Sequence, residues 1–332
     1  MSTNYRAVVI GCGNVGAQWG TEPNRPQPAS HAAALKANER TELVGLVDQD
    51  PVQLKKVGEF YGVATYADAA EALSALKPDL VVVATPPSTH EALFKIAVDA
   101  GVRLVICEKP LSDTLEAAQR MTDLIKSSPV LAMVNHQRRY APLFRAAKER
   151  IKQGELGDIQ QVSAYYTNGL LNNGTHTIDT LRFLLQDEVA WVIGIENKNN
   201  TVAPAGGLNI DGLIGFTKGT TVSLQSLNND AYILHDFSFY GTKGLLEIHK
   251  YGFRFEWTPA NVVTLPKVME LDWDSTQVSL ESGSMIAGTT AHAVECLDGA
   301  TPEGSIEDGY KTMQVLQALL ESAKQGGVKI TI

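Results

Sequence analysis

Two charged residues directly after a short apolar run are the first feature of this sequence that could do chemistry. Residues 102–107 predict a buried strand, and Glu108 and Lys109 follow it, ahead of Pro110. Ligands of open parallel sheets bind just beyond the carboxyl ends of the strands. A lysine held there by a proline turn, with a cis or a trans bond, would face a cofactor or substrate. The alternative is that both charges form a solvated strand end.

A glycine-rich segment near the N-terminus has the spacing of a dinucleotide-binding turn. The pattern Gly-x-Gly-x-x-Gly follows the apolar run 7–10 directly. Such glycines permit a tight turn, close approach of the backbone to a pyrophosphate, and close packing of helix on strand. Amide groups at the next helix start would hold the phosphates. The candidate cofactor contacts here are Gly11, Gly13, Asn14, Val15 and Gly16, with a plain glycine turn as the alternative.

An acidic residue ends the next apolar run. Residues 43–47 predict a second buried strand, and Asp48 follows it. Its carboxylate could accept hydrogen bonds from ribose hydroxyls and would repel a 2′-phosphate, so we expect NAD rather than NADP. The alternative is a turn or cap residue. Asp48 follows Gly16 at more than the usual interval of about twenty residues, because proline-rich residues 20–29 intervene. They form a lid over the cofactor or, as we favour, a surface loop, and Ser30 caps the helix that resumes.

Strands and helices that would position these residues alternate along the first part of the sequence. Apolar strands and helices follow one another up to residue 134, which predicts a parallel, doubly wound sheet covered on both faces. After a helix over 140–153 and a strand over 159–167, the pattern predicts a helix over 175–185. Strand-like runs joined by glycine turns come next and favour an antiparallel sheet. We expect residues 258–284 to be irregular and helices over 289–297 and 306–324, before a last strand.

Composition narrows the class of protein. A chain of 332 residues with 44% hydrophobic and 20% charged residues is long enough for two globular domains. Its net charge of −9 argues against nucleic acid as the main partner. No apolar run is long enough for a membrane span, and the N-terminus lacks the pattern of a secretory signal. The scattered Cys12, Cys107 and Cys296 lack metal-ligand spacing, so we expect a cytoplasmic protein without a bound metal.

Several motifs, taken in order, resemble one family. They are the glycine segment, Asp48, Ala84-Thr-Pro-Pro87 with His90, Glu108-Lys-Pro110, Val134-Asn-His-Gln-Arg-Arg-Tyr140, Asn172-Asn-Gly-Thr-His176 with Asp179, and Phe239-Tyr-Gly-Thr-Lys-Gly244. Over nearly its whole length the sequence resembles the glucose–fructose oxidoreductase, inositol dehydrogenase and MocA (Gfo/Idh/MocA) family. That implies a Rossmann-type domain over 1–128 and a C-terminal α+β domain over 129–332. The latter's large, mainly antiparallel open sheet commonly joins homodimers or homotetramers, and the C-terminal helix could pack back on the first domain.

The resemblance also implies roles for individual residues. Lys109 and His176 would be the catalytic pair that points at the reacting carbon. Further cofactor contacts would come from Thr85, Pro86, His90, Glu108 and Lys109. Substrate contacts would come from Lys109, His176, Asp179, Asn172 and Tyr165. The spacing of two of these residues is consistent with a shared site. His176 and Asp179 are three apart, so they share one face of a predicted helix near its start.

This site predicts an NAD(P)-dependent dehydrogenase or reductase acting on CH–OH groups. Hydride transfer from an alcohol needs a base for the hydroxyl proton and a positive group for the developing alkoxide. We assign His176 as the acid–base group and Lys109 as the stabiliser, and the reverse assignment stays open. The sequence departs from the family at Asn172, where aspartate is usual. An amide can bind a sugar hydroxyl but cannot raise the basicity of His176, which argues against an inositol dehydrogenase.

The expected substrate is therefore a sugar, a cyclitol or a nucleotide-linked sugar. Two other functions remain open. One is an NAD-dependent glycosidase with transient redox chemistry, and the other is a non-catalytic regulator that binds a dinucleotide and a partner protein. The presence of both Lys109 and His176 argues against the regulator, since a sensor need not keep both.

Overall fold

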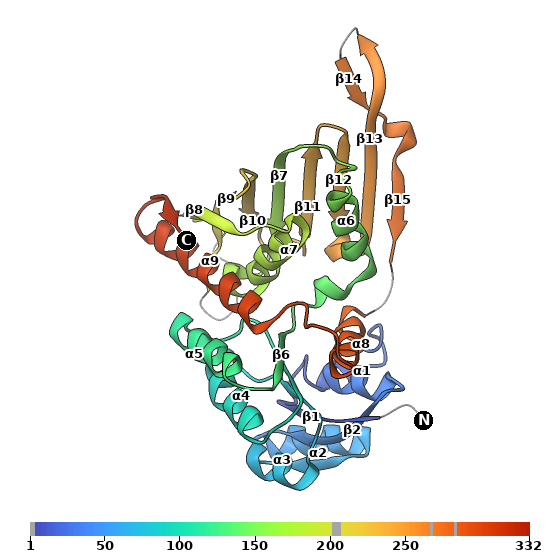
Figure 1. The fold of residues 1–332 in the computed structure, drawn as a ribbon, viewed down its shortest axis with the longest axis vertical. Helices are drawn as coiled ribbons and strands as arrows, with labels where there is room; N and C mark the ends of the chain where they lie inside the picture. Colours follow the sequence, from blue (N-terminus) through green and yellow to red (C-terminus); the bar gives the residue numbers. More distant parts are fainter. Residues whose placement is uncertain (1–3, 201–206, 266–267, 282–283) are drawn as a thin grey trace. The chain divides into compact units, whose positions relative to one another are not determined.

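The computed structural model describes residues 4–200, 207–265, 268–281 and 284–332. The chain forms two compact units, drawn in Figure 1. The first contains Met1–Tyr140 and Gly283–Lys311, and the second contains Ala141–Ser282 and Thr312–Ile332.

The first unit is built on a parallel sheet of six strands. Their spatial order is β3 (Ala64–Tyr66), β2 (Thr41–Val47), β1 (Tyr5–Ile10), β4 (Leu80–Val83), β5 (Leu104–Cys107) and β6 (Leu131–Val134). Every residue of β4 and β5 is buried, as expected for apolar strands with helices on both faces. The predicted doubly wound sheet is thus confirmed. The short, mostly exposed β3 carries no apolar pattern and escaped prediction.

Helices connect these strands, and side-chain caps fix where most of them begin. They are α1 (His31–Ala37), α2 (Pro51–Tyr61), α3 (Ala69–Leu76), α4 (His90–Asp99), α5 (Leu115–Lys126) and α8 (Met285–Leu297). Ser30, Asp50, Asp68 and Thr114 each accept a hydrogen bond from a backbone amide of the helix that follows. Capping of this kind satisfies donors that have no partner within the helix. The predicted cap at Ser30 is therefore present.

The proline-rich insertion interrupts a helix and then lets it resume. The amides of His31 and Ala32 donate to the carbonyls of Val15 and Gly16, which residues 19 and 20 would receive in an uninterrupted helix. Twelve residues are thus looped out. Without them Asp48 would follow Gly16 at the usual interval of about twenty residues. Residues 23–27 are exposed, and Arg25 lies 4.3 Å from the Trp19 ring centroid, so the insertion packs on itself as a loop.

The contacts divide the chain elsewhere than the boundary predicted after residue 128. Strand β6 pairs with β5 in the first sheet, which keeps the chain up to Tyr140 in the first unit. Helix α8 then returns to this unit from far along the sequence. There His292 stacks on Tyr140 with ring centroids 5.0 Å apart. Sequence alternation alone could not show this return, because α8 follows a long stretch that belongs to the second unit.

The second unit contains a large, mainly antiparallel sheet, as predicted. Among the described residues this sheet has ten strands, in the order β14 (Val268–Leu271), β13 (Arg254–Leu265), β12 (Gly244–His249), β11 (His235–Gly241), β7 (Ile159–Tyr166), β10 (Thr221–Ser226), β9 (Ile210–Phe216), β8 (Val189–Glu196) and β16 (Ile330–Thr331), with β15 (Gln277–Leu280) beside β13. All of these pairs are antiparallel except β7 with β10.

Helices cover one face of this sheet, as Figure 1 shows for α6 (Pro142–Lys152) and α7 (Thr175–Leu185). Arg150 of α6 lies over the rings of Phe255 and Trp257. Thr177 of α7 lies 3.1 Å from His235, which pairs in register with Tyr166. The long helix α9 (Ile306–Lys324) begins in the first unit and ends in the second.

Part of the stretch predicted to be irregular, 258–284, is extended. Strand β13 continues to Leu265, and β14 and β15 follow it. Both strands are only four residues long and most of their residues are exposed, so neither has a buried apolar face of the kind that predicts a strand. Residues 266–267 and 282–283 of this stretch lie outside the described part of the chain.

Candidate active site

The glycine segment forms a tight turn at the carboxyl end of β1. Gly11 has a φ of +96°, and a Cβ there would lie 2.5 Å from the Ala84 carbonyl oxygen. A Cβ on Gly16 would lie 1.9 Å from the Gly11 carbonyl oxygen, so this glycine lets the turn close on itself. A Cβ on Gly13 would meet nothing within 4 Å. Gly13 therefore faces open space, where a phosphate could approach the backbone.

Asp48 holds this turn from the end of β2. One carboxylate oxygen accepts a 2.6 Å hydrogen bond from the Cys12 amide, and the other accepts one of 2.9 Å from the Asp50 amide. The predicted turn role of Asp48 is therefore present. Each carboxylate oxygen has capacity for a further hydrogen bond, so a ribose role is compatible with it. Burial and the Asp48 charge raise the pKa of the Cys12 thiol to about 12, so this cysteine stays protonated.

A cavity of about 660 Å³ opens beside these residues. It lies at the carboxyl ends of β1, β2 and β4, and its walls include Gly13, Asp48, Asp68, Thr85 and Pro86. None of the described residues that line it is a lysine or arginine. Its position is where open α/β sheets bind dinucleotides, and its volume suits a cofactor.

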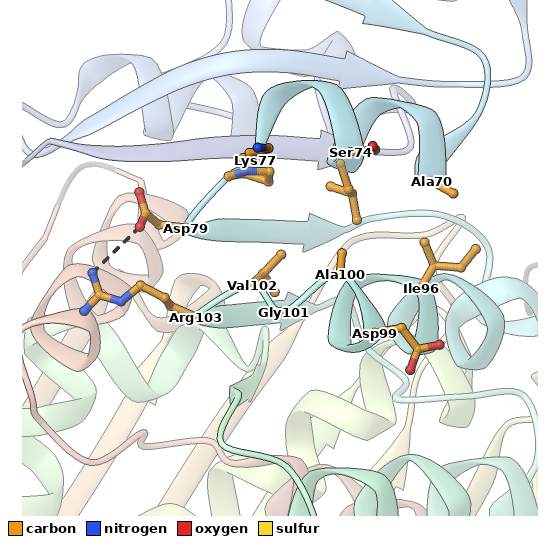
Figure 2. Close-up of a pocket in the computed structure, with 12 residues that line it drawn as sticks. Ala70, Ser74, Lys77, Asp79, Ile96, Asp99, Ala100, Gly101, Val102 and Arg103 are labelled. Carbon is orange, nitrogen blue, oxygen red and sulfur yellow. Dashed lines mark ion pairs between the residues drawn. The ribbon is translucent and has the colours of Figure 1, made fainter.

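A second cavity, of about 750 Å³, lies at the opposite edge of the same sheet (Figure 2). Asp79 and Arg103, just before β4 and β5, form an ion pair of 3.8 Å in its wall. This is the amino end of the strands, and dinucleotides bind at the other end. The larger cavity is therefore not the cofactor site.

Lys109 emerges from the carboxyl end of β5, as predicted, and its peptide bond to Pro110 is cis. Burial lowers the pKa of its amine to about 8, although the Glu108 carboxylate acts to raise it. Arg138 lowers it further. The amine can thus gain or lose a proton near neutral pH, which few lysines can do.

Glu108 is buried, so it does not form the solvated strand end that was the alternative reading. Its side chain accepts hydrogen bonds from Asn135 at 2.6 Å and from the Lys109 amide at 3.1 Å, and His31 lies 2.8 Å away. Burial alone would raise the pKa of Glu108, but the hydrogen bonds and charge of its neighbours hold it at about 2. The predicted cofactor contact is thus a carboxylate turned toward the protein interior.

His90 differs from its predicted role in the same way. It is fully buried and is not among the residues that line the cavity. Its ring nitrogens lie 2.8 Å from the Thr85 carbonyl oxygen and 3.1 Å from that of Leu111. His90 therefore joins the segment after β4 to the segment that carries Lys109, and it positions Thr85 and Pro86 rather than facing a cofactor.

In the second unit, His176 is the second residue of α7, which spans the predicted residues 175–185. Asp179 lies one turn later, and its carboxylate is 4.0 Å from buried Arg182. All of α7 is buried. A π-helix, Gly169–Gly174, precedes it and includes the partly buried Asn172. π-Helical turns are rare and occur often at functional sites. The sequence did not indicate this turn.

Tyr165 does not lie where the prediction put it. Side chains alternate across a strand, so Tyr165 is on the face opposite Tyr166. His235 pairs with Tyr166 and contacts Thr177 of α7, which places α7 on the Tyr166 face. The sheet thus separates Tyr165 from His176 in this unit, and Tyr165 is not a substrate contact of that face.

His235 and Tyr251, which the sequence did not indicate, lie on the α7 face instead. His235 is fully buried 3.1 Å from the hydroxyl of Thr177. Asn173 donates a 2.7 Å hydrogen bond to the Tyr251 hydroxyl. Tyr251 has a φ of +65°, which is rare for a bulky residue and is found where the surroundings enforce it. No local motif marked His235 or Tyr251, whereas Asn173 lies within the motif Asn172-Asn-Gly-Thr-His176.

Across residues 4–200, 207–265, 268–281 and 284–332, no three His, Cys, Asp or Glu side chains are grouped as ligands for a metal ion. No helix within those residues is both long and apolar enough to cross a membrane.

The first unit thus defines a class of protein, since its strand order, glycine turn and cavity are those of a dinucleotide-binding Rossmann domain. Residues 5–136 match an oxidoreductase family with an NAD-binding Rossmann fold, GFO_IDH_MocA. The D-apiose dehydrogenase of Paraburkholderia graminis is 25% identical, over 97% of this chain and 88% of the relative. The inositol 2-dehydrogenase of Rhizobium meliloti is 28% identical, over 48% of this chain and 52% of the relative.

Solved structures share the fold of the whole chain. An inositol dehydrogenase homolog from Azotobacter vinelandii, complexed with NADH and myo-inositol, superposes with a TM-score of 0.79. It is 19% identical, and the match covers 100% of this chain and 98% of the other. The chain thus matches the Gfo/Idh/MocA family over residues 5–136, and its named relatives support an oxidoreductase of the dehydrogenase and reductase type.

Proposed function

We propose that this protein transfers a hydride between NAD and a secondary alcohol or ketone of a sugar, cyclitol or nucleotide-linked sugar. The observation that carries the proposal is Lys109, whose amine has a pKa near 8 and emerges at the cofactor-binding edge of the sheet. The relatives named above act on sugars and polyols, which favours a substrate rich in hydroxyl groups.

Each residue has a defined task in this proposal. A bound nicotinamide would supply the hydride or accept it. The Lys109 ammonium would stabilise the developing negative charge on the substrate oxygen, and His176 would move the hydroxyl proton. The reverse assignment remains compatible with the lowered pKa of Lys109. Asp179 and Asn172 would bind hydroxyl groups, and an amide at 172 favours a sugar other than inositol.

The substrate class is tested directly with the purified protein. Absorbance of the reduced nicotinamide should grow when NAD and the right member of a panel of sugars and polyols are added. His176→Ala should lower that turnover by about 10²-fold or more if the imidazole moves a proton. Tight nucleotide binding without turnover in either direction, over a broad panel, would refute the proposal in favour of a regulator. Release of an aryl leaving group without net cofactor reduction would point to a glycosidase.

We further propose that Asp48 makes the site prefer NAD. It lines the cavity together with Asp68, and none of the described lining residues is a cation that could bind a 2′-phosphate. Asp48→Asn should weaken NAD binding about tenfold, since a hydrogen bond to a charged group contributes about 1.5–3 kcal/mol, and should weaken NADP binding less. Fluorescence titration with both nucleotides measures the ratio of the two dissociation constants.

A control removes one negative charge close by. Asp50 caps α2, is exposed and does not line the cavity. Asparagine caps helices as well as aspartate does, so Asp50→Asn should leave the ratio unchanged. An equal change in both variants would show that the Asp48 effect is only one of overall charge.

A further inference from the structure

Four buried side chains from four separate segments of the first unit form one hydrogen-bonded cluster. His31 begins α1, Glu108 follows β5, Asn135 follows β6, and Thr289 lies in α8. His31 Nε2 lies 2.8 Å from Glu108 Oε1, and Asn135 donates to the same oxygen at 2.6 Å. The Thr289 hydroxyl donates to Asn135 Oδ1 at 2.8 Å. We call these four residues the Glu108 cluster.

The direction of each hydrogen bond follows from the charge of Glu108. An ionised carboxylate only accepts, so His31 must carry its hydrogen on Nε2. The Asn135 amide is oriented by its two partners, because its oxygen accepts from Thr289 and its nitrogen donates to Glu108. A buried carboxylate is costly unless it is hydrogen-bonded. The cluster thus supplies the donors that permit a charged Glu108 in the interior.

His31 also connects the cluster to the glycine segment. Its backbone amide donates a 2.9 Å hydrogen bond to the Val15 carbonyl, while its side chain contacts Glu108. It is the residue at which α1 resumes after the insertion. One fully buried residue therefore joins the predicted phosphate turn to the segment that carries Lys109.

We propose that His31 is a positioning residue for Lys109, acting with Asn135 and Thr289 to keep the Glu108 carboxylate charged and fixed beside it. The cluster thereby sets the pH range over which the Lys109 amine holds its proton. This inference rests on the catalytic role proposed for Lys109, but the chemical effect on the amine can be measured without any substrate.

The charges around Lys109 determine the sign of the effect. The Glu108 carboxylate raises the pKa of the amine, whereas burial and Arg138 lower it. Cys107 is also close to Glu108, but burial holds its thiol pKa well above the usual value, so it is uncharged. Loss of a hydrogen-bond donor from the cluster favours the neutral form of Glu108. The carboxylate charge that raises the Lys109 pKa is then lost, while burial still lowers that pKa. The Lys109 pKa should fall.

The amine itself can be titrated by NMR after reductive methylation of the lysines with ¹³C, with Lys109→Arg to assign the resonance. His31→Leu removes the donor and should lower the Lys109 midpoint by about one pH unit, the size of the effect of one neighbouring charge. His31→Gln keeps an N–H donor, so its Lys109 midpoint should stay close to that of the wild-type protein. Thr289→Val, a milder change at the edge of the cluster, should shift the midpoint in the same direction by less.

A matched control distinguishes positioning from simple stability. His292 is also buried in the first unit, in the same helix as Thr289, but it contacts Glu295 rather than the cluster. His292→Leu should lower the melting temperature without moving the Lys109 midpoint. An unchanged midpoint in folded His31→Leu would overturn the proposal. If His31→Leu does not fold, an unchanged midpoint in Thr289→Val would overturn it equally.

Turnover provides the second readout. The part of the pH profile of turnover that reports titration of the Lys109 amine should move to lower pH in His31→Leu. It should move by the same amount as the NMR midpoint, whether the amine acts as an acid or as a base. A midpoint that moves while the pH profile of turnover does not would confirm the cluster and refute the catalytic role of Lys109. Failure of the proposal for the Glu108 cluster is therefore distinguishable from failure of the proposed catalytic role of Lys109.

Discussion

The Lys109→Met variant is expected to lose activity and gain stability together. Without the amine, turnover should fall by about 10²-fold or more, the usual effect of losing a group that stabilises developing charge or moves a proton. The melting temperature at pH 7 should rise, because burial lowers the Lys109 pKa to about 8 despite the Glu108 carboxylate. A lysine with a lowered pKa is charged less favourably in the folded protein than in the unfolded chain. Steady-state kinetics and calorimetry measure the two effects.

The pH dependence identifies the amine as the source of that gain. Below pH 8 the amine is charged in both states, so its full destabilising effect is present. Between about 8 and 10.5 the folded protein releases the proton while the unfolded chain keeps it. Wild-type stability should therefore rise relative to Lys109→Met over this range. A variant that melts below wild type under pH 8 would contradict the argument.

A surface lysine provides the control for Lys109→Met. Lys95 is exposed and pairs with Asp99 at 2.6 Å within one helix. Exposed pairs of this kind contribute less than about 1 kcal/mol. Lys95→Met should therefore alter neither turnover nor the pH dependence of stability.

The sequence predicts the first unit well where one physical rule decides the structure. Apolar runs buried on both faces predict parallel strands, and β5 lies within the predicted range 102–107. Sterics fix the glycine turn, since a Cβ on Gly11 or Gly16 would overlap the backbone. Lys109 follows a buried strand, so its place at the carboxyl end of β5 was predictable from the same rule.

Contacts between distant segments could not be predicted in this way. The Glu108 cluster joins His31 to Thr289, more than 250 residues apart in the sequence. No local pattern specifies such a contact, because burial of a polar side chain depends on what the rest of the fold supplies. Tyr165 shows a related difficulty. Its strand was predicted, but the face on which it lies depends on where α7 packs.

The second large effect is expected from two neighbouring glycines that serve different purposes. Gly16→Ala should destabilise the protein by about 3 kcal/mol, the cost of forcing an atom into a closed space, since its Cβ would lie 1.9 Å from the Gly11 carbonyl oxygen. Gly13→Ala should leave stability within about 0.5 kcal/mol of wild type, because its Cβ would meet nothing within 4 Å. Thermal or denaturant unfolding without nucleotide measures both.

For nucleotide binding, the Gly13→Ala variant, which should barely affect stability, is expected to show the large effect. The methyl group of Gly13→Ala would occupy the space through which a pyrophosphate reaches the backbone, so NAD should bind at least about tenfold more weakly, or about 1.4 kcal/mol. Stabilisation by saturating NAD, seen as a rise in melting temperature, should be reduced in this variant. A Gly13→Ala protein that binds NAD like wild type would place the phosphates elsewhere. The cavity beside Asp48 would then lose the open approach at Gly13 as support for a cofactor site, and only its position at the carboxyl ends of the strands would distinguish it from the cavity at the opposite edge of the sheet.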